Sequence, residues 1–128
     1  MIVGVGVDIV DFARVRSMLE RLGEDRVYGR LLTEAERAYC VRMHDAVKHV
    51  AARLAAKEAA FKALAGSFEA RGVGWREIEV THDEHRRPHL VLHQKAAARA
   101  EDLGVKRAHL TMTHGDTSAV AMVVFEGA

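Results

Sequence analysis

The 128-residue sequence predicts a single α+β domain over residues 1–128, in which a largely antiparallel sheet packs against helices. Three observations predict this class. The N-terminal residues alternate as a strand, the middle of the chain shows helical periodicity, and the C-terminal half returns to paired strands around one helix. The expected order is strand, three helices, two strands, helix, two strands (βαααββαββ), with no linker or internal repeat to divide the chain.

Residues 2–10 alternate as a strand with two different faces. One face carries the branched residues Val3, Val5, Val7 and Ile9. The other carries Ile2, Gly4, Gly6 and Asp8. Because two residues of the second face lack side chains, a bulky group can approach it closely. Two interpretations stay open: the glycines permit tight packing while Asp8 caps the next helix, or Asp8 belongs to a ligand site.

The remaining elements follow from periodicity and from start and stop signals. The predicted helices span 11–22, Glu34–Met43, Asp45–Ala65 and Gln94–Leu103. Thr33 and Glu36 have the spacing of a capping box. The helix stops are the glycines Gly23, Gly66 and Gly104. The predicted strands form two pairs, Glu77–Thr81 with Leu90–Leu92 and Arg107–Thr113 with Ala119–Phe125.

The composition argues against several functional classes. A net charge of +1 disfavours a protein whose main task is neutralising nucleic-acid phosphates. No stretch approaches the ~20 apolar residues of a membrane-spanning helix. The start MIVGVGVDIV has no features of a secretory signal, and one cysteine, Cys40, cannot form an internal disulfide. We therefore expect a cytoplasmic protein without a membrane or nucleic-acid partner, and we interpret most of the eight histidines as exposed polar residues.

The helix predicted over Asp45–Ala65 places charged residues within its apolar face. Its apolar stripe consists of Val47, Val50, Leu54, Phe61 and Leu64. Lys57 and Glu58 project into this stripe, and Lys62 lies at its edge one turn beyond Glu58. A buried lone carboxylate is costly, so Glu58 requires a cation, a metal or hydrogen-bond donors nearby.

Two explanations account for this arrangement. Glu58 and Lys62 could form a local ion pair between successive turns. Alternatively the helix lines a site in which Glu58 binds a metal while Lys57 and Lys62 meet anionic groups of a ligand. Asp8 offers a second carboxylate and favours the site, because two carboxylates completed by phosphate oxygens and water suit Mg²⁺.

These segments resemble the holo-acyl-carrier-protein synthases, a family of 4′-phosphopantetheinyl transferases, over essentially the whole chain. The pairing of a Gly-x-Asp strand, in Gly4–Val10, with a Lys-Glu-x-x-x-Lys helix, in Ala52–Ala63, carries the resemblance. Leu32–Glu36, Trp75–Val80 and Leu110–His114 follow in the expected order. The resemblance implies Mg²⁺-dependent transfer of phosphopantetheine from coenzyme A to a serine of an apo acyl carrier protein, with adenosine 3′,5′-bisphosphate as the second product.

The resemblance also implies roles for individual residues. Asp8 and Glu58 match the magnesium ligands, and Lys62 matches a contact to the pyrophosphate of coenzyme A. Arg53 matches a contact to its nucleotide end. His114 matches a histidine beside the phosphates, and with Lys62 it would assist catalysis. The general base stays open between Glu58 and Asp8.

The expected partners are the carrier protein and further copies of the chain. The first predicted helix matches the family's docking helix, and its face with Arg14, Met18 and Arg21 suits an acidic, helical carrier. A merely solvated helix face is the alternative. The family forms homotrimers with active sites between subunits, so Asp8 and Glu58 would face His114 or Arg53 across a subunit boundary.

The sequence departs from the family in two loops beside the phosphates. Gly66-Ser67 and Gly115 replace the family's usual residues, and residues 42–49, where adenine contacts would be sought, do not align cleanly. Two other functions therefore stay open. One is a binding module for coenzyme A or a carrier protein without catalysis. The other is a structural domain in which Lys57, Glu58 and Lys62 form only an ion-pair network.

Overall fold

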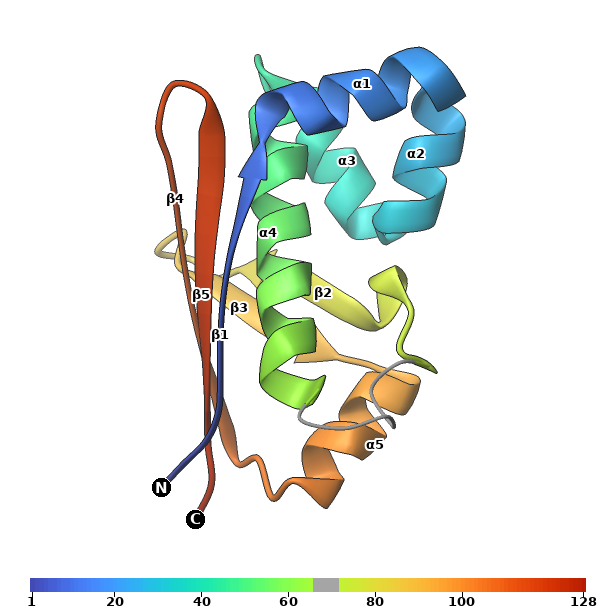
Figure 1. The fold of residues 1–128 in the computed structure, drawn as a ribbon. Coiled ribbons are helices and arrows are strands. Elements are labelled where there is room, and N and C mark those ends of the chain that lie inside the picture. Colours follow the sequence, from blue (N-terminus) through green and yellow to red (C-terminus); the bar gives the residue numbers. More distant parts are fainter. Residues whose placement is uncertain (66–71) are drawn as a thin grey trace.

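The computed structural model describes residues 1–65 and 72–128 and has the predicted α+β class (Figure 1). The first half contains β1 (Ile2–Asp11), α1 (Phe12–Leu22), α2 (Glu24–Leu31), α3 (Glu34–Arg42) and α4 (Ala46–Ala65). The second half contains the short 3-10 helix η2 (Trp75–Glu77), β2 (Ile78–His82), β3 (Pro88–Leu92), α5 (Gln94–Asp102), β4 (Arg107–His114) and β5 (Ser118–Glu126). The order of the predicted elements is confirmed.

The structure adds one helix, α2, to the three predicted between the first and second strands. Gly23, with φ of 84°, ends α1 and is also the N-cap of α2, so the predicted stop is directly followed by a new helix. Sequence periodicity missed α2 because it has only eight residues and contains Gly29. Burial of its apolar side chains stabilises it, and these are Val27, Tyr28 and Leu31.

The strands form two antiparallel sheets, one with the order β1-β5-β4 and one with the pair β2-β3. Helix α4 packs along the inner face of the larger sheet, against β1 and β5, and contacts α1, α3 and β2 on its other sides (Figure 1). Helix α4 is therefore buried on more sides than the single apolar face that the sequence predicted. Most of the additional buried positions are alanines, and Arg53 is buried as well; the alanines are Ala51, Ala55, Ala56, Ala59, Ala60 and Ala63.

The outer face of the larger sheet is apolar and exposed. Val5, Val7 and Ile9 of β1 are 56%, 54% and 59% exposed, and Met122, opposite Val7 on β5, is 43% exposed. Among residues 1–65 and 72–128, no helix covers this face (Figure 1). Within those same residues, no helix is long and apolar enough to cross a membrane.

Two local signals in the sequence have definite outcomes. The predicted capping box is confirmed: the Glu36 amide donates to Thr33 Oγ1 at 3.2 Å, and the Thr33 amide donates to Glu36 Oε1 at 2.9 Å. The alternative that Asp8 caps the first helix is wrong, because β1 continues to Asp11 and Asp11 is the N-cap. Asp8 is instead left on the inner face of the sheet.

Candidate active site

Close packing between β1 and α4 brings together the two carboxylates that the sequence singled out. A Cβ atom at Gly6 would lie 1.8 Å from the Ala59 carbonyl oxygen of α4, and one at Gly4 would lie 2.3 Å from that of Ala63. Only glycine permits so close an approach of a helix backbone. The predicted tight packing is confirmed, and the bulky group on the glycine face is the backbone of α4 itself.

Two cations from different elements neutralise these carboxylates. Lys62 Nζ lies 2.8 Å from Asp8 Oδ1 and also donates to the Val7 carbonyl at 3.2 Å. Arg14 of α1 donates through Nη2 to Glu58 Oε1 at 2.8 Å and through Nη1 to Glu58 Oε2 at 3.4 Å. The local Glu58–Lys62 pair considered from the sequence is therefore replaced by two long-range pairs.

The pKa values of the two carboxyl groups move in opposite directions. Burial raises the pKa of Glu58, and its hydrogen bond with Asp8 raises it further, while Arg14 offsets only part of this. Burial also acts to raise the pKa of Asp8, but hydrogen bonds to Glu58 and Lys62 and the charges of Lys62 and Arg14 lower it below the usual range. Glu58 is thus the better proton acceptor of the pair, and Asp8 stays ionised.

The residues present fit a magnesium ion. The hydrogen bond between two carboxyl groups needs a proton, and without one Asp8 Oδ2 is buried with no hydrogen-bond donor among the described residues. A cation would satisfy that oxygen. No cluster of three or more histidine, cysteine or acidic side chains occurs in the described part of the chain. Two carboxylates suit Mg²⁺, which commonly takes one or two carboxylates and completes its shell with water and phosphate oxygens.

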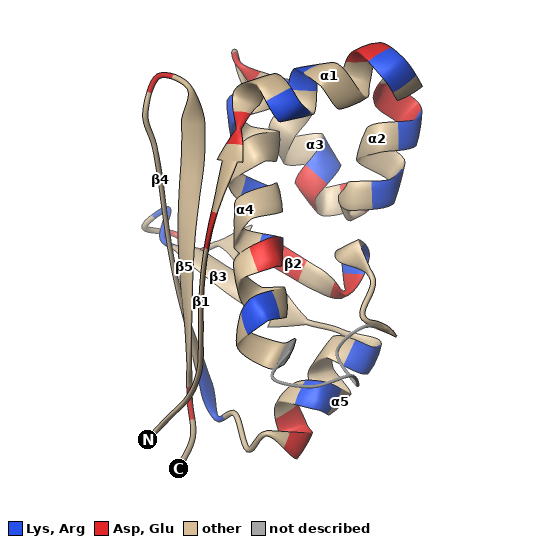
Figure 2. Ribbon diagram, viewed as in Figure 1, with Lys and Arg blue, Asp and Glu red and all other residues tan. Residues whose placement is uncertain are grey.

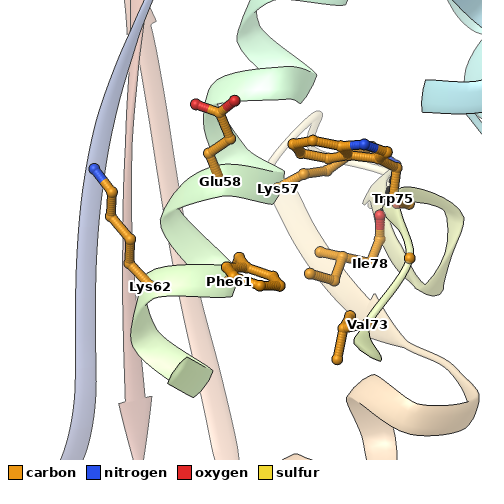
Figure 3. Close-up of a pocket in the computed structure, with 8 residues that line it drawn as sticks. Lys57, Glu58, Phe61, Lys62, Val73, Trp75 and Ile78 are labelled. Atoms are coloured by element: carbon orange, nitrogen blue, oxygen red, sulfur yellow. Dashed lines mark hydrogen bonds between the residues drawn. The ribbon is translucent and has the colours of Figure 1, made fainter. Parts of the chain in front are cut away.

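A pocket of about 320 Å³ opens beside Glu58 and Lys62. Its apolar lining comes from Phe61 of α4 and from the segment around η2, as Figure 3 shows. The apolar side chains are Phe61, Val73, Trp75 and Ile78. A pocket with an apolar wall and charged groups at one edge can hold a ligand that joins an apolar or uncharged chain to an anionic group.

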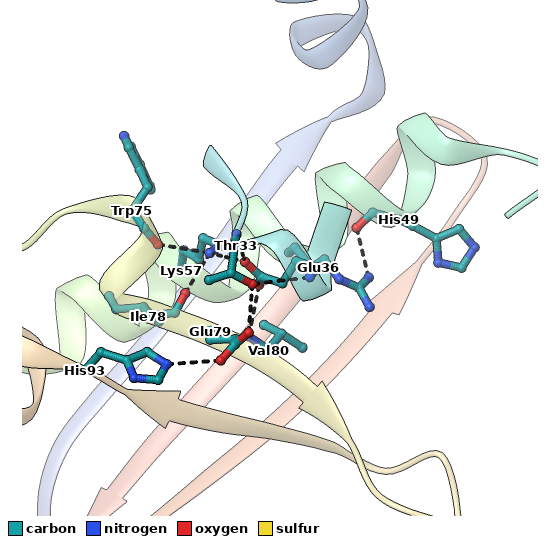
Figure 4. Close-up of polar contacts among 10 residues, drawn as sticks. Thr33, Glu36, His49, Lys57, Trp75, Ile78, Glu79, Val80 and His93 are labelled. Atoms are coloured by element: carbon teal, nitrogen blue, oxygen red, sulfur yellow. Dashed lines mark hydrogen bonds and ion pairs between the residues drawn. The ribbon is translucent and has the colours of Figure 1, made fainter. Parts of the chain in front are cut away.

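Lys57 also lines this pocket, but its ammonium is directed into the core, which corrects the prediction that it meets an anionic ligand. Its side chain is fully buried. The ammonium donates to Glu36 Oε1 at 2.7 Å and to the carbonyl oxygens of Trp75 at 2.9 Å and Ile78 at 2.6 Å (Figure 4). Three acceptors use all three donors of the ammonium. Lys57 therefore joins α4 to α3 and β2 inside the core.

Arg53 lies at a second pocket, of about 240 Å³, on another side of α4. It is 2% exposed, its guanidinium lies 4.3 Å from the centre of the Tyr39 ring, and it donates to the His49 carbonyl at 3.2 Å. Tyr39 also stacks on His82. Arg53 Nε is buried without an acceptor among the described residues. A buried guanidinium with a free donor beside stacked rings suits an anionic, aromatic ligand such as a nucleotide.

His114 lies on the Arg53 side of the molecule, away from the carboxylates. It stands opposite Ala119 on β5, Asp8 stands opposite Ala121, and β5 separates the two outer strands. Two strand spacings amount to about 10 Å. Burial and the charge of Arg53 lower the pKa of His49, and His114 lies close enough to lower it further. Within one chain, the structure does not bring His114 to Asp8 and Glu58.

The helix face predicted to dock a partner borders a basic groove of about 160 Å³ between α1 and α2. Figure 2 shows basic residues, here all arginine, along both helices. Of the predicted residues, Arg14 and Met18 line the groove, whereas Arg21 is exposed outside its lining. The lining residues that the sequence reasoning missed include Arg26, Arg30 and Trp75. Arg26 and Arg30 lie on α2, so a search of the Glu24–Leu31 segment for a short amphipathic helix could have found them.

Of the two loops in which the sequence departs from the family, only the one with Gly115 lies in the described part of the chain. Gly115 lies in the β4–β5 turn, where its amide donates to the Ser118 carbonyl at 2.9 Å and a Cβ atom would meet open space. That amide is therefore already paired within the turn. Gly66-Ser67 lies outside the described residues.

Comparison with known proteins identifies the family of this chain. The sequence profile of the 4′-phosphopantetheinyl transferase superfamily matches residues 4–122. A holo-[acyl-carrier-protein] synthase of Koribacter versatilis is 46% identical over 126 residues, covering 98% of this chain and 99% of that protein. One from Alkalilimnicola ehrlichii is 46% identical over 127 residues, covering 98% of both.

Solved structures give the same result. The holo-[acyl-carrier-protein] synthase of Neisseria meningitidis has a TM-score of 0.83 at 30% identity, covering 98% of this chain and 99% of that one. That of Bacillus anthracis, in complex with CoA (3′,5′-ADP), has a TM-score of 0.79 at 34% identity, covering 100% of this chain and 99% of that one. Similarity of both sequence and fold along nearly the whole chain confirms the resemblance, and the protein belongs to the 4′-phosphopantetheinyl transferase superfamily, among enzymes of the holo-[acyl-carrier-protein] synthase type.

Proposed function

We propose that the protein transfers 4′-phosphopantetheine from coenzyme A to a serine of an apo acyl carrier protein, with release of adenosine 3′,5′-bisphosphate. The observation that carries this proposal is the meeting of Asp8, Glu58 and Lys62 at the edge of an apolar pocket. The Bacillus anthracis relative, solved in complex with CoA (3′,5′-ADP), supports coenzyme A as the donor.

Coenzyme A carries charge at its pyrophosphate and its 3′-phosphate, and the chain has cationic groups suited to both. Lys62, 56% exposed, is free to turn from Asp8 to the pyrophosphate. Arg53, beside the Tyr39 ring, suits the nucleotide end. His114 would contact phosphates held at the carboxylate site of a neighbouring copy, because it does not reach the carboxylates of its own chain.

Asp8 and Glu58 would hold Mg²⁺, which when bound neutralises charge on the pyrophosphate. The serine hydroxyl attacks the β-phosphorus, the bond from that phosphorus to the bridging oxygen breaks, and the bisphosphate departs. Glu58 is the proposed acceptor of the serine proton, because in the metal-free chain its pKa is raised while that of Asp8 is lowered. Lys62 donates to the phosphate oxygens as negative charge develops on them.

The carrier would dock at the groove between α1 and α2. Arg14, Arg26 and Arg30 supply its positive charge, and Met18 and Trp75 supply apolar contact. This pattern suits a helix that combines acidic and apolar residues. Arg21 would contribute only from the exposed rim.

A homotrimer would explain two features that a single chain leaves unexplained. The apolar outer face of β1 and β5 requires a cover, and His114 is separated from the carboxylates it is expected to assist. Association of copies through this face would cover it and allow His114 of one copy to approach Asp8 and Glu58 of another.

The direct test is mass spectrometry of an apo carrier protein incubated with the enzyme, coenzyme A and Mg²⁺. The carrier mass should increase by about 340 Da, the mass of the phosphopantetheine arm in this reaction class. Unchanged mass across several fatty-acid and polyketide carriers would overturn the proposal.

Replacement of Glu58 tests the assigned site. Glu58→Gln should lower the rate of carrier modification by at least about 100-fold, because it removes both a metal ligand and the proton acceptor. Glu101→Gln, at an exposed position on α5, is the matched control and should retain the wild-type rate. Equal rates for the two variants would contradict the assignment of Glu58.

One observation favours a second candidate, a structural domain without catalysis: Arg14 and Lys62 already neutralise both carboxylates. Thermal unfolding distinguishes the two functions. Coenzyme A with Mg²⁺ raises the melting temperature of an enzyme that binds them and leaves that of a purely structural domain unchanged. A rise without carrier modification would indicate the binding module.

A further inference from the structure

Lys57 holds one wall of the apolar pocket in place from inside the core. Its ammonium donates to the main-chain carbonyl oxygens of Trp75 at 2.9 Å and Ile78 at 2.6 Å (Figure 4), and both of these residues line the pocket. Among residues 1–65 and 72–128, no other side chain of α4 donates a hydrogen bond to the backbone of η2 or β2. The position of this wall relative to α4 therefore depends on Lys57.

Glu36 fixes the position of Lys57 in turn. Its Oε1 accepts from Lys57 at 2.7 Å and from the Thr33 amide at 2.9 Å, and its Oε2 accepts from the Val80 amide at 2.9 Å. Ile78 and Val80 are alternate residues of β2, so the carbonyl and the amide point to the same edge of the strand. Along that edge, the ion pair takes the place of a neighbouring strand.

We propose that Lys57 is a positioning residue for coenzyme A: it fixes the wall of the pocket that receives the pantetheine arm. This inference rests on the proposed function, and it adds which part of the donor the pocket takes and which residue shapes the pocket. Lys57 acts through Trp75 and Ile78, because its own ammonium is directed into the core.

The chemistry of the pocket suits the pantetheine arm. The arm is an uncharged chain of methyl, methylene and amide groups that is joined to the pyrophosphate. The pocket combines an apolar wall, including Phe61 and Trp75, with Glu58 and Lys62 at one edge. Its volume of about 320 Å³ is at the lower end of the range for ligand pockets, about 300–1,000 Å³. A small displacement of the wall therefore changes the fit of a bound chain.

A buried ion pair at this place has a geometric role that an apolar pair would not have. Both side chains are 0% exposed, and well-packed apolar groups often stabilise a core as well as a buried ion pair does. Apolar groups would fill the same space without binding the two carbonyl oxygens. Protein stability and the position of the wall are therefore separable by mutation.

The experiment compares two ligands by isothermal titration calorimetry on the full-length protein with Mg²⁺. Coenzyme A carries the pantetheine arm, whereas adenosine 3′,5′-bisphosphate lacks it. The double variant Lys57→Met, Glu36→Gln removes both charges, so no unpaired charge is left in the core. This variant should bind coenzyme A about 5- to 10-fold more weakly, because the wall is no longer held in its binding position. It should bind the bisphosphate as the wild type does.

The ratio of the two affinities is the decisive quantity, because unfolded protein lowers the number of sites for both ligands equally. Val50→Ala, at a fully buried position of α4 outside the linings of both pockets, should destabilise the protein and leave the ratio unchanged. Lys57→Arg keeps the charge beside Glu36 but changes the donor geometry, so it should alter the ratio less than the double variant. It also provides the test if the double variant does not fold.

Phe61→Ala tests the occupant of the pocket. It removes apolar contact from the lining, so it should weaken coenzyme A binding relative to bisphosphate binding. An unchanged ratio in Phe61→Ala would show that the arm lies elsewhere and would overturn the inference. A ratio that changes in Phe61→Ala but not in the folded Lys57 variants would overturn the positioning role.

Failure of this inference is distinguishable from failure of the proposed function. Wild-type protein that modifies the carrier, together with Lys57 variants that keep the wild-type ratio, refutes the positioning role alone. Wild-type protein that modifies no carrier refutes the proposed function and the inference with it.

Discussion

At the scale of single residues, two lysines on α4 show how surroundings decide function. Lys57 and Lys62 are the same residue type on the same helix. Lys57 is fully buried with three acceptors, whereas Lys62 is largely exposed and pairs with a carboxylate at a pocket edge. One lysine therefore stabilises the core and the other is available to a ligand.

Substitution by methionine should separate the two roles. Lys57→Met leaves the buried Glu36 carboxylate without its cation, and we expect the free energy of unfolding to fall by about 3–5 kcal/mol. Lys62→Met should hardly alter stability but should weaken coenzyme A binding. Urea unfolding and coenzyme A titration measure these effects. Equal destabilisation by both substitutions would show that Lys57 is not a core residue.

The histidines at the Arg53 pocket predict how stability depends on pH. Burial lowers the pKa of His49 and of His82, and the charge of Arg53 lowers both further. Near the unfolded value of 6.5 the unfolded chain then binds more protons than the folded chain. Stability should therefore be greatest above that value and should fall as the pH drops below it.

Melting temperatures measured between about pH 8 and about pH 5 test this, because the range spans the ordinary histidine pKa. The double variant His49→Gln, His82→Gln should show a smaller decrease on acidification. A double variant with the same pH profile as the wild type would assign the decrease to other groups. The exposed pair His109–Glu126 provides a comparison, and His109→Gln should not flatten the profile.

At the scale of elements, the contact between β1 and α4 forms the carboxylate site. Gly4 and Gly6 face the backbone of α4 at Ala63 and Ala59, and this approach places Asp8 beside the Glu58–Lys62 turns of the helix. The two glycines therefore position the proposed catalytic groups by letting β1 approach α4 closely.

A single methyl group should disturb this contact. Gly6→Ala places a Cβ atom 1.8 Å from the Ala59 carbonyl oxygen, so α4 must move away from β1. We expect a loss of at least about 2–3 kcal/mol in stability and a loss of transferase activity. Gly29→Ala, in α2 with open space around it, is the matched control and should stabilise the protein by about 0.4–1 kcal/mol. Equal urea unfolding midpoints for Gly6→Ala and the wild type would show that the contact between β1 and α4 tolerates a side chain.

At the scale of the whole molecule, the outer sheet face determines assembly in our proposal. Its exposed positions, Val5, Val7, Ile9 and Met122, lie in register on adjacent strands and form one continuous apolar surface. A soluble monomer rarely leaves such a surface open. Coverage by other copies of the chain provides a physical reason for a trimer.

A charge on this face should prevent assembly. Val7→Glu places a carboxylate at the centre of the apolar surface, so sedimentation at micromolar concentration should shift from trimer to monomer. Val91→Glu, at an exposed valine on β3 outside this face, should sediment as the wild type. Val7→Glu should also lower the rate of carrier modification, because it prevents assembly, whereas Val91→Glu should leave this rate unchanged. Wild-type protein that sediments as a monomer would contradict the trimer.

Much of the fold could be predicted because its signals are local. Alternation in β1, the Thr33–Glu36 box and the helix stops at Gly23 and Gly104 are properties of neighbouring residues, and each has its predicted form. Helix α2 escaped prediction, because eight residues with a central glycine show too little periodicity and its stability comes from packing.

The sequence alone singled out the two candidate carboxylates, because Asp8 shares its strand face with two glycines and Glu58 interrupts an apolar helix face. The tertiary structure decided which cationic side chain pairs with each of these carboxylates. Lys57 turns into the core toward Glu36, while Arg14, 44 positions from Glu58 along the chain, reaches its carboxylate. The physical reason is that ion pairs between distant segments depend on how helices and strands pack, and local periodicity carries no information about that packing.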